Sequence, residues 1–260
     1  MKIMIGMIHL GALPGSPGNK LDVESLEASS LQDLMVLEKS GFDAAIVENI
    51  SDEPFIVDSM ELETFSAYVA ILRTITKKAK IDIGVSVQMN LWREMLAAST
   101  ATGASFVRIS AFTEERICAE GRIGPVAADA LRYRRAINSK VRIAADVQVK
   151  HSFPIISEEH SDYFAQMADR FADYVIVTSS STGKAVDIEY LSRMRKILKK
   201  PVWVGSGVSE DNIRDILRVA DGAIVGTSIK KDGLTANPVD MDRASRIVKA
   251  AKNIGATDDN

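Results

Sequence analysis

Short apolar runs rich in β-branched residues alternate with longer amphipathic stretches from one end of the chain to the other. In the stretch ahead of Gly41, for example, Leu26, Leu34 and Leu37 repeat at the spacing of one helix face. Strands that are each followed by a helix pair in parallel, because the helix carries the chain back to its starting edge. Eight such units predict an α/β fold, a single closed (β/α)8 TIM barrel. The eight runs span residues 3–8, 44–47, 83–87, 106–109, 142–147, 174–177, 202–204 and 223–225.

Two kinds of strand opening recur along the chain and support closure of the barrel. Lys80, Lys140 and Lys200 open the third, fifth and seventh runs at an even spacing of 60 residues. Odd and even strands are expected to differ where alternate strands fill alternate layers of a barrel interior. The alternative is that loops before strands simply favour lysines and small–aspartate pairs. The second, sixth and eighth runs open instead with an apolar residue and an aspartate, which is Asp43, Asp173 or Asp221.

No linker or shift in composition divides the chain, so we expect one barrel over residues 1–256 and a disordered tail at 257–260. The longest irregular stretches follow the first, second and fourth strands. In a barrel these are loops at the carboxyl ends of the strands, where active sites lie. They span residues 11–23, 49–58 and 110–124.

The charge balance and the cysteine count exclude several classes of protein. Lys and Arg number 32 against 35 Asp and Glu, a net charge of −3, so the chain lacks the basic excess typical of proteins that bind nucleic-acid polymers. No apolar run approaches the roughly 18 residues that span a bilayer. His9 interrupts the apolar start, which favours a buried strand over a signal peptide. The single Cys118 excludes an internal disulfide and fits a reducing, cytoplasmic location.

Glycines directly after the seventh and eighth strands predict a phosphate site. Glycine lets backbone amides approach an anion closely, and the loops after these two strands commonly hold phosphate in barrels. We expect Ser209 to cap the helix that follows the seventh strand. The alternative is a pair of tight turns that bind no ligand. The predicted phosphate-binding residues are Gly205, Ser206, Gly207, Gly226 and Thr227.

The fifth strand carries polar residues on the face that would point into the barrel. Alternation along residues 143–151 places Asp146, Gln148 and Lys150 on that face. Buried polar groups are costly unless they pair or bind a ligand, so Asp146 is a candidate general base or metal ligand. Lys150 is a candidate electrostatic clamp, or an amine for Schiff-base formation. An internal Asp–Lys ion pair that closes the barrel top is the alternative.

Polar residues at the ends of other strands are expected to meet at the same mouth. Arg108 shares a strand face with Ser110, and a buried arginine needs a carboxylate partner, for which Glu48 and Asp146 are candidates. Together with Asp146 and Lys150, Glu48 and Arg108 form the predicted catalytic set. The predicted substrate-binding residues are His9, Asn49, Asn90, His151 and Thr178.

The sequence requires no metal or cofactor. It has no pair of histidines one helical turn apart, and no serine nucleophile elbow, Walker loop or dinucleotide fingerprint. A divalent metal at the mouth would have His9, Glu48, Asp146 and His151 as its ligands.

Several motifs, spread from residue 7 to residue 240, occur together in this chain. They include Met7-Ile8-His9-Leu10, Leu13-Pro14-Gly15, Glu48-Asn49, Ala145-Asp146-Val147, Val149-Lys150-His151, Gly205-Ser206-Gly207-Val208 and Val225-Gly226-Thr227 with Lys230. Together they resemble the BtpA/SgcQ family, and the resemblance covers nearly the whole chain. It implies a barrel of the ribulose-phosphate-binding type; cyanobacterial members are associated with photosystem I biogenesis, and others have been proposed as enzymes. The chain differs from the family pattern at Leu91, Ser110, Glu114 and Ser179.

Three functional hypotheses follow from the residues and the resemblance. The first is a lyase, isomerase or hydrolase that acts on a small phosphorylated metabolite, either a sugar phosphate or a nucleotide-derived compound. The second is a non-catalytic assembly or stability factor, which predicts an apolar partner-binding patch on an outer face. The third is a sensor that binds the metabolite without turnover. A homo-oligomer is compatible with each of them.

Overall fold

The structure is a computed structural model that describes residues 2–149, 151–157, 160–178 and 186–253, so the predicted tail at 257–260 lies outside the described residues. The barrel strands are β1 (Ile3–His9), β2 (Ala44–Glu48), β3 (Asp82–Ser86), β4 (Phe106–Ile109), β7 (Arg142–Val147), β9 (Tyr174–Val177), β10 (Val202–Val204) and β11 (Gly222–Val225). They pair in parallel in the order β1-β11-β10-β9-β7-β4-β3-β2, and β2 pairs with β1 to close the barrel. The predicted closed barrel is therefore confirmed, and each predicted run matches its strand to within one residue.

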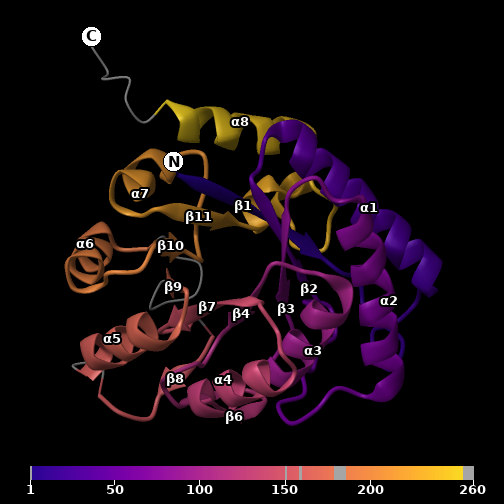
Figure 1. The fold of residues 1–260 in the computed structure, drawn as a ribbon. Helices are drawn as coiled ribbons and strands as arrows, with labels where there is room; N and C mark the ends of the chain where they lie inside the picture. The colour runs from indigo at the N-terminus through magenta and orange to yellow at the C-terminus, as the bar shows by residue number, and fades with distance from the viewer. Residues whose placement is uncertain (1, 150, 158–159, 179–185, 254–260) are drawn as a thin grey trace.

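Helices surround the strands, as Figure 1 shows. The first begins at the cap Asp22, whose side chain accepts a hydrogen bond from the amide of Ser25, and ends at Gly41 in the left-handed region with φ 89°. The helices are α1 (Val23–Ser40), α2 (Leu62–Lys78), α3 (Trp92–Thr102), α4 (Ala127–Ala136), α5 (Ser161–Phe171), α6 (Ile188–Ile197), α7 (Ile213–Val219) and α8 (Met241–Lys252), with 3-10 turns η2 (Thr227–Ile229) and η3 (Lys231–Gly233).

An aromatic cluster fills the barrel interior near the amino ends of the strands. Trp203 stacks on Tyr174 with ring centroids 4.1 Å apart, and it meets Phe106 edge-on at 5.5 Å. Gly84 and Gly222 make room for these rings, because a Cβ there would lie 2.3 Å from the Phe106 ring and 2.9 Å from Cδ1 of Trp203. The plugged interior leaves the carboxyl ends of the strands as the side from which a ligand enters.

Hydrogen bonds explain why an aspartate recurs before the second, sixth and eighth barrel strands. Each aspartate donates its backbone amide to the carbonyl of a residue in the preceding barrel strand, and its carboxylate accepts the amide of that same residue, at distances of 2.7 to 3.0 Å. The carboxylate thus satisfies a backbone group near the strand's amino end. At the corresponding position before β4 the residue is Ser105, whose amide makes the same backbone hydrogen bond, to the carbonyl of Ile83. The three pairs are Asp43 with Met4, Asp173 with Ile143, and Asp221 with Val202.

The stretch 110–124, expected to be irregular, contains two short strands that join a third from another loop. They are β5 (Arg116–Cys118), β6 (Gly121–Ile123) and β8 (Phe153–Pro154), and all pairs are antiparallel. A buried ion pair at 2.9 Å between Arg116 and Glu114 supports this small sheet, and Arg116 also donates to Ser152 next to β8. Strands this short carry too little periodicity to be predicted from the sequence.

A second buried ion pair fastens the segment after β11 to the first helix. Nζ of Lys230 donates to Oδ2 of Asp33 at 2.7 Å, and the two side chains are 0% and 6% exposed. The other oxygen, Oδ1 of Asp33, accepts the amide of Val239 at 2.7 Å. Burial lowers the pKa of Lys230, and the charge of Asp33 opposes that shift. One carboxylate therefore holds both ends of the segment 230–239.

We expect Lys230→Met to lower the free energy of unfolding by about 3–5 kcal/mol, because it leaves the Asp33 carboxylate buried without its cation. The double variant Asp33→Asn/Lys230→Met should recover most of this loss, since the charge that needed a partner is gone. Urea denaturation measures both. The exposed pair Arg218–Asp215 provides the control: Arg218→Met should change stability by only about 0.5 kcal/mol. A Lys230→Met variant as stable as this control would contradict the expectation.

Candidate functional site

The barrel interior changes from apolar to polar at the carboxyl ends of the strands. Side chains alternate along a strand, so the residues two positions beyond the apolar interior also point inward. Met7, Ile46 and Ile176 belong to that apolar interior. Two of the following inward positions, directly after β10 and β11, are glycines. The last inward positions are His9, Glu48, Ser86, Arg108, Asp146, Thr178, Gly205 and Gly226.

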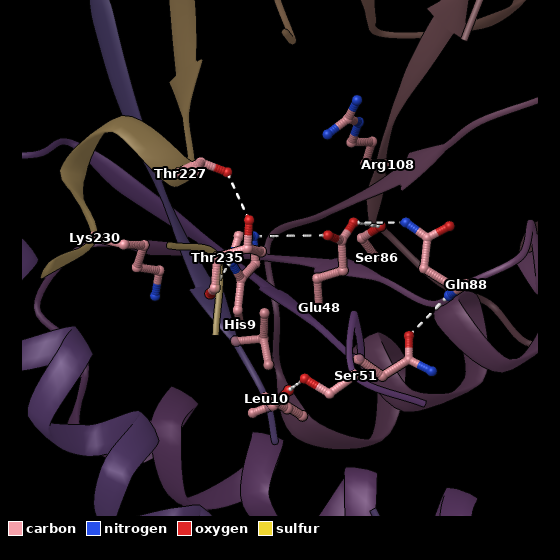
Figure 2. Close-up of polar contacts among 12 residues, drawn as sticks. His9, Leu10, Glu48, Ser51, Ser86, Gln88, Arg108, Thr227, Lys230 and Thr235 are labelled. Atoms are coloured by element: carbon pink, nitrogen blue, oxygen red, sulfur yellow. Dashed lines mark hydrogen bonds and ion pairs between the residues drawn. The ribbon is translucent and has the colours of Figure 1, made fainter. Parts of the chain in front are cut away.

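Glu48 uses its two carboxylate oxygens differently. Oε1 accepts hydrogen bonds from Oγ of Ser86 at 2.8 Å and from Nε2 of Gln88 at 2.9 Å. Oε2 faces Nε2 of His9 at 3.8 Å, which is too long for a hydrogen bond. Figure 2 shows the carboxylate between these two groups of partners. Its orientation is therefore fixed through Oε1, while Oε2 is aimed at the histidine.

Arg108 and Asp146 form a buried, two-pronged ion pair. Nε and Nη2 of the arginine donate to the two carboxylate oxygens at 3.0 and 2.8 Å, so the arginine pairs with one of the two carboxylates expected from the sequence. Burial alone would lower the pKa of Arg108, but the charge and hydrogen bonds of Asp146 outweigh it and hold that pKa above its ordinary value. Glu48 adds a smaller effect in the same direction. The guanidinium is a permanent positive charge among the inward polar side chains at the carboxyl ends of the strands, which we call the polar layer.

His9 lies between Glu48 and a backbone carbonyl (Figure 2). Its Nδ1 is 3.3 Å from the carbonyl oxygen of Thr235, and its side chain is 8% exposed. Burial lowers the pKa of His9; the charge of Glu48 opposes this shift and that of Lys230 adds to it. Burial therefore favours the neutral imidazole.

The glycine turns at Gly205–Gly207 after β10 and at Gly226–Thr227 after β11 lie side by side, and we call them the glycine corners. β10 pairs with β11, and Oγ of Ser228 donates to the carbonyl of Val208 at 2.7 Å, which joins the two loops directly. A Cβ on Gly205 would lie 2.5 Å from Cγ2 of Ile176 and 3.1 Å from Nη2 of Arg108, so a larger residue would displace the arginine.

The corners also adjoin the polar layer and open to solvent. A Cβ on Gly226 would lie 3.5 Å from Cε1 of His9. Gly207 has a left-handed φ of 66°, and it is exposed, as is Thr227. The amide of Gly205 is already used, since it donates to the carbonyl of Val177 at 3.0 Å. Among the described residues, the amides of the next two, Ser206 and Gly207, have no backbone acceptor.

The expected cap of α7 is wrong. The helix begins at Ile213, later than predicted, and Ser209 donates its amide to Oδ1 of Asn212 instead of capping with its side chain. Nδ2 of Asn212 donates to the carbonyl of Gly207, so this asparagine shapes the corner. Glu210 lies ahead of the helix and pairs with Arg246.

Three of the predicted substrate-binding side chains make hydrogen bonds within the protein. Asn49 accepts the amide of Gln88 and donates to Asp52. Asn90 accepts the amide of a residue after β4, and Thr178 donates to two carbonyls at the end of β7. These contacts shape the loops around the mouth.

The alternation predicted for the fifth strand does not continue to Gln148. β7 ends at Val147, and Gln148 has a left-handed φ of 55°, so alternation stops there. The amide of Gln148 donates to Oε1 of Glu114, a buried residue at one of the departures from the family pattern. His151 follows on the exposed surface, and Lys150 lies outside the described residues.

Sequence reasoning missed Thr235 and Asp33. No local pattern marks Thr235, because its contact to His9 joins residues 226 positions apart. Asp33 did have a signal: it lies on the apolar face of α1 with Leu26, Leu34 and Leu37, where a charged residue needs a buried partner. That partner is Lys230.

In the part of the chain that the structure describes, three or more His, Cys, Asp or Glu side chains nowhere gather in a way that would hold a metal ion. The same part contains no helix with the length and apolar character needed to cross a membrane.

The chain is similar to known proteins over nearly its whole length. The model of the BtpA family matches residues 1–253. An uncharacterized protein of Archaeoglobus fulgidus is 37% identical over 251 residues, which cover 96% of this chain and 99% of that protein. The photosystem I biogenesis protein BtpA of Synechocystis is 31% identical over 249 residues, with 95% and 87% covered.

Solved structures share the fold at low sequence identity. N-(5'-phosphoribosyl)anthranilate isomerase of Pyrococcus furiosus has a TM-score of 0.62 at 16% identity and covers 97% of this chain and 100% of its own. Tryptophan synthase of Mycobacterium tuberculosis has a TM-score of 0.63 at 18% identity, with 96% and 92% covered. At these identities the likeness shows the barrel fold alone.

We expect His9→Gln to make stability less dependent on pH. Because the pKa of folded His9 is below the ordinary value of about 6.5, the unfolded chain binds a proton first as pH falls through that value. The free energy of unfolding of the wild type therefore decreases below about pH 6.5, and His9→Gln removes this contribution. Urea denaturation above and below that pH measures the difference. The exposed His160 gives the control variant His160→Gln, and an identical pH dependence for both variants would contradict the assignment.

Proposed function

Since this chain belongs to the BtpA family and folds as a closed (β/α)8 barrel, we propose that it is an enzyme acting on a small phosphorylated metabolite. The phosphate would bind at the glycine corners after β10 and β11, and the reacting carbons would lie over the polar layer. A sugar phosphate or a compound derived from a nucleotide has the required combination of an anion and nearby hydroxyl or carbonyl groups. The reaction class that suits these groups is proton transfer, as in an isomerase or lyase.

This proposal rests on one observation: the glycine corners, where the phosphate would bind, contact the polar side chains where the chemistry would occur. Gly205 lies against Arg108 and Gly226 lies against His9. A phosphate held by the amides of Ser206 and Gly207 would place the rest of the molecule over these two side chains. Binding and chemistry would therefore occur in one pocket.

Within that pocket the charged residues have distinct roles. Arg108 would stabilise negative charge that develops on a substrate oxygen, and Asp146 orients the guanidinium. Glu48 would contact the reacting groups through Oε2. Lys150 remains a predicted clamp from its place after β7, and His151 remains a predicted substrate ligand. Asn49, Asn90 and Thr178 would act indirectly, by shaping the loops.

Two proteins with this fold are named for phosphorylated compounds, which supports the proposed ligand class. One is the phosphoribosylanthranilate isomerase described above. Another is thiamine phosphate pyrophosphorylase of Pyrococcus furiosus, with a TM-score of 0.58 at 17% identity, 97% of this chain covered and 96% of that one.

We expect ribose 5-phosphate and inorganic phosphate to stabilise the protein against unfolding, and ribose to have no effect. A ligand at about 100 times its Kd would add about 2.7 kcal/mol. Thr227→Glu should weaken binding of both phosphates by at least about tenfold, a loss of about 1.4 kcal/mol, because the new carboxylate repels the anion. Thermal-shift titration and calorimetry measure these effects.

The matched control is Ser29→Glu, which makes the same charge change at an exposed position on α1. It should leave phosphate binding unchanged. Absence of phosphate binding, or equal binding by Thr227→Glu and the wild type, would contradict the proposal. Binding of a metabolite that is never turned over would identify a sensor that uses the same pocket.

An exposed apolar patch favours a second candidate function, an assembly role. Ile117 and Phe153 are paired across β5 and β8 and are 45% and 75% exposed, and exposed Ile155 and Ile156 follow directly. Patches of this kind mark protein contacts. The Synechocystis relative is named for biogenesis of an assembly, which agrees with this candidate.

We expect the patch to join two copies of the chain. The variant Ile117→Ser/Phe153→Ser should sediment as a monomer at concentrations where the wild type is a dimer. Leu62→Ser changes a residue that is 82% exposed at the start of α2, and it should leave the dimer intact. A monomeric wild type would contradict the expectation that this patch joins two copies. An assembly role, unlike catalysis, would also survive Asp146→Asn.

A further inference from the structure

We propose that His9 exchanges a proton with the substrate through Nε2, and that Thr235 is a positioning residue that determines which ring nitrogen is free to do so. This inference rests on the proposed function, because it names the reacting atom in the same pocket. It changes the role of His9 from a predicted substrate ligand to a catalytic residue, and it gives a role to a segment that lies far from β1 in sequence.

The carbonyl of Thr235 selects one tautomer of the ring. A carbonyl oxygen only accepts, so its contact with Nδ1 of His9 at 3.3 Å requires the hydrogen on Nδ1. In the neutral ring, Nε2 then carries a lone pair. Figure 2 shows the ring of His9 facing the Glu48 carboxylate, which Nε2 approaches to 3.8 Å. The free nitrogen is thus aimed into the polar layer, where the substrate would lie.

The partner of that nitrogen is also an acceptor. Oε2 of Glu48 is 3.8 Å from Nε2, and Oε1 of the same carboxylate is engaged by Ser86 and Gln88. Nε2 of His9 and Oε2 of Glu48 are both acceptors. A substrate group that presents one hydrogen to each of them would therefore complement the pair. A carbon that bears a hydroxyl and lies next to a carbonyl has this property, because its C–H is acidic and its O–H is a donor.

The segment that carries Thr235 is fastened at several points. Lys230 pairs with Asp33, and the amide of Val239 donates to the other oxygen of Asp33. Lys230 and Val239 also form an antiparallel bridge, which closes the segment into a loop. Oγ1 of Thr235 contacts Oγ1 of Thr227 at 2.9 Å, in the turn of the predicted phosphate corner. The loop therefore links the anion corner to the histidine.

The proton-transfer step balances with these groups alone. Nε2 of His9 takes the proton from the carbon next to the carbonyl, and the electron pair of that C–H bond forms an enediolate. Glu48 stabilises the resulting imidazolium, and Arg108 faces the negative oxygen. The imidazolium then returns the proton to the neighbouring carbon, and the hydroxyl proton passes to the other enediolate oxygen. The product is therefore an isomer of the substrate. No oxidant or co-reactant is needed.

The same geometry limits the substrate to a short molecule. His9 ends β1 and Gly226 directly follows β11, and these neighbouring strands are about 4.8 Å apart. The phosphate at the corner and the reacting carbon are therefore separated by only a few bonds. The expected class is a small hydroxyaldehyde or hydroxyketone phosphate.

The test is the tautomer of His9 in solution. In protein labelled with nitrogen-15 histidine, a two-bond proton–nitrogen correlation spectrum distinguishes hydrogen on Nδ1 from hydrogen on Nε2. The chain has three histidines, and His9→Gln assigns the signal. We expect the Nδ1-protonated neutral form at pH 7 for His9. The Nε2-protonated form, or a charged ring, would overturn the proposal.

Asp33→Asn/Lys230→Met tests whether the fastened segment sets the tautomer. We expect this variant to remain folded and to show a mixture of the two tautomers for His9, with His151 and His160 unchanged. The control Asp215→Asn/Arg218→Met alters an exposed pair on α7 and should leave the wild-type tautomer. A pure Nδ1-protonated ring in the first variant would refute the positioning role of the segment, since a merely structural ion pair would not move this signal.

Titration with inorganic phosphate separates this inference from the proposed function. Phosphate bound near Gly226 places negative charge beside His9, so the pKa of His9 should rise and the amide of Thr227 should shift. A shift at Thr227 with no change at His9 would overturn the role of His9 and leave the phosphate site standing. If His9 shows the Nδ1-protonated form but neither His9 nor Thr227 responds to phosphate, the histidine geometry is supported and the proposed ligand class is contradicted.

Discussion

The parallel pairing of β1 with β11 joins the first strand of the chain to the last, and the candidate site depends on it. Through this pairing His9 lies beside Gly226, although the two residues are 217 positions apart in the sequence. A second contact joins the two ends of the chain outside the strands, since Asp33 on α1 binds Lys230 after β11. A barrel open at this seam would have neither the anion corner next to the histidine nor the loop that orients its ring.

The polar layer is tolerated in a buried place because its members satisfy one another. Arg108 and Asp146 pair through two hydrogen bonds, and Oε1 of Glu48 accepts two. Below them the interior is filled by aromatic rings, with glycines where the rings need space. The two corner glycines differ in this respect. At Gly205 the place of a Cβ is taken by Ile176 and Arg108, so this glycine lets the arginine approach the backbone, whereas at Gly226 a Cβ would meet nothing closer than 3.5 Å. Space beside β11 thus arises from the absence of a side chain at Gly226.

Most of the architecture could be predicted from the sequence because it depends on local patterns. Strand runs, the glycine corners and the need of Arg108 for a carboxylate partner follow from periodicity and from the cost of buried charge, while the structure identifies Asp146 as that partner. The recurring aspartates were recognised as a pattern, and the structure supplies their physical cause: Asp43 and its equivalents bind both backbone groups of a residue in the preceding strand. Features that depend on distant contacts could not be predicted. The left-handed turn at Gln148 is stabilised by Glu114, and the orientation of His9 depends on Thr235.

The small sheet at the barrel mouth ties two loops into one unit. β5 and β6 come from the loop after β4, while β8 comes from the loop after β7, and the three share backbone hydrogen bonds. An insertion in either loop would shift the register of the other, so the two are expected to change length together during evolution. Divergence of specificity on this side of the mouth would then proceed through coupled changes in both loops, whereas the loops after β1 and β2 lie outside this sheet and are not bound by that coupling.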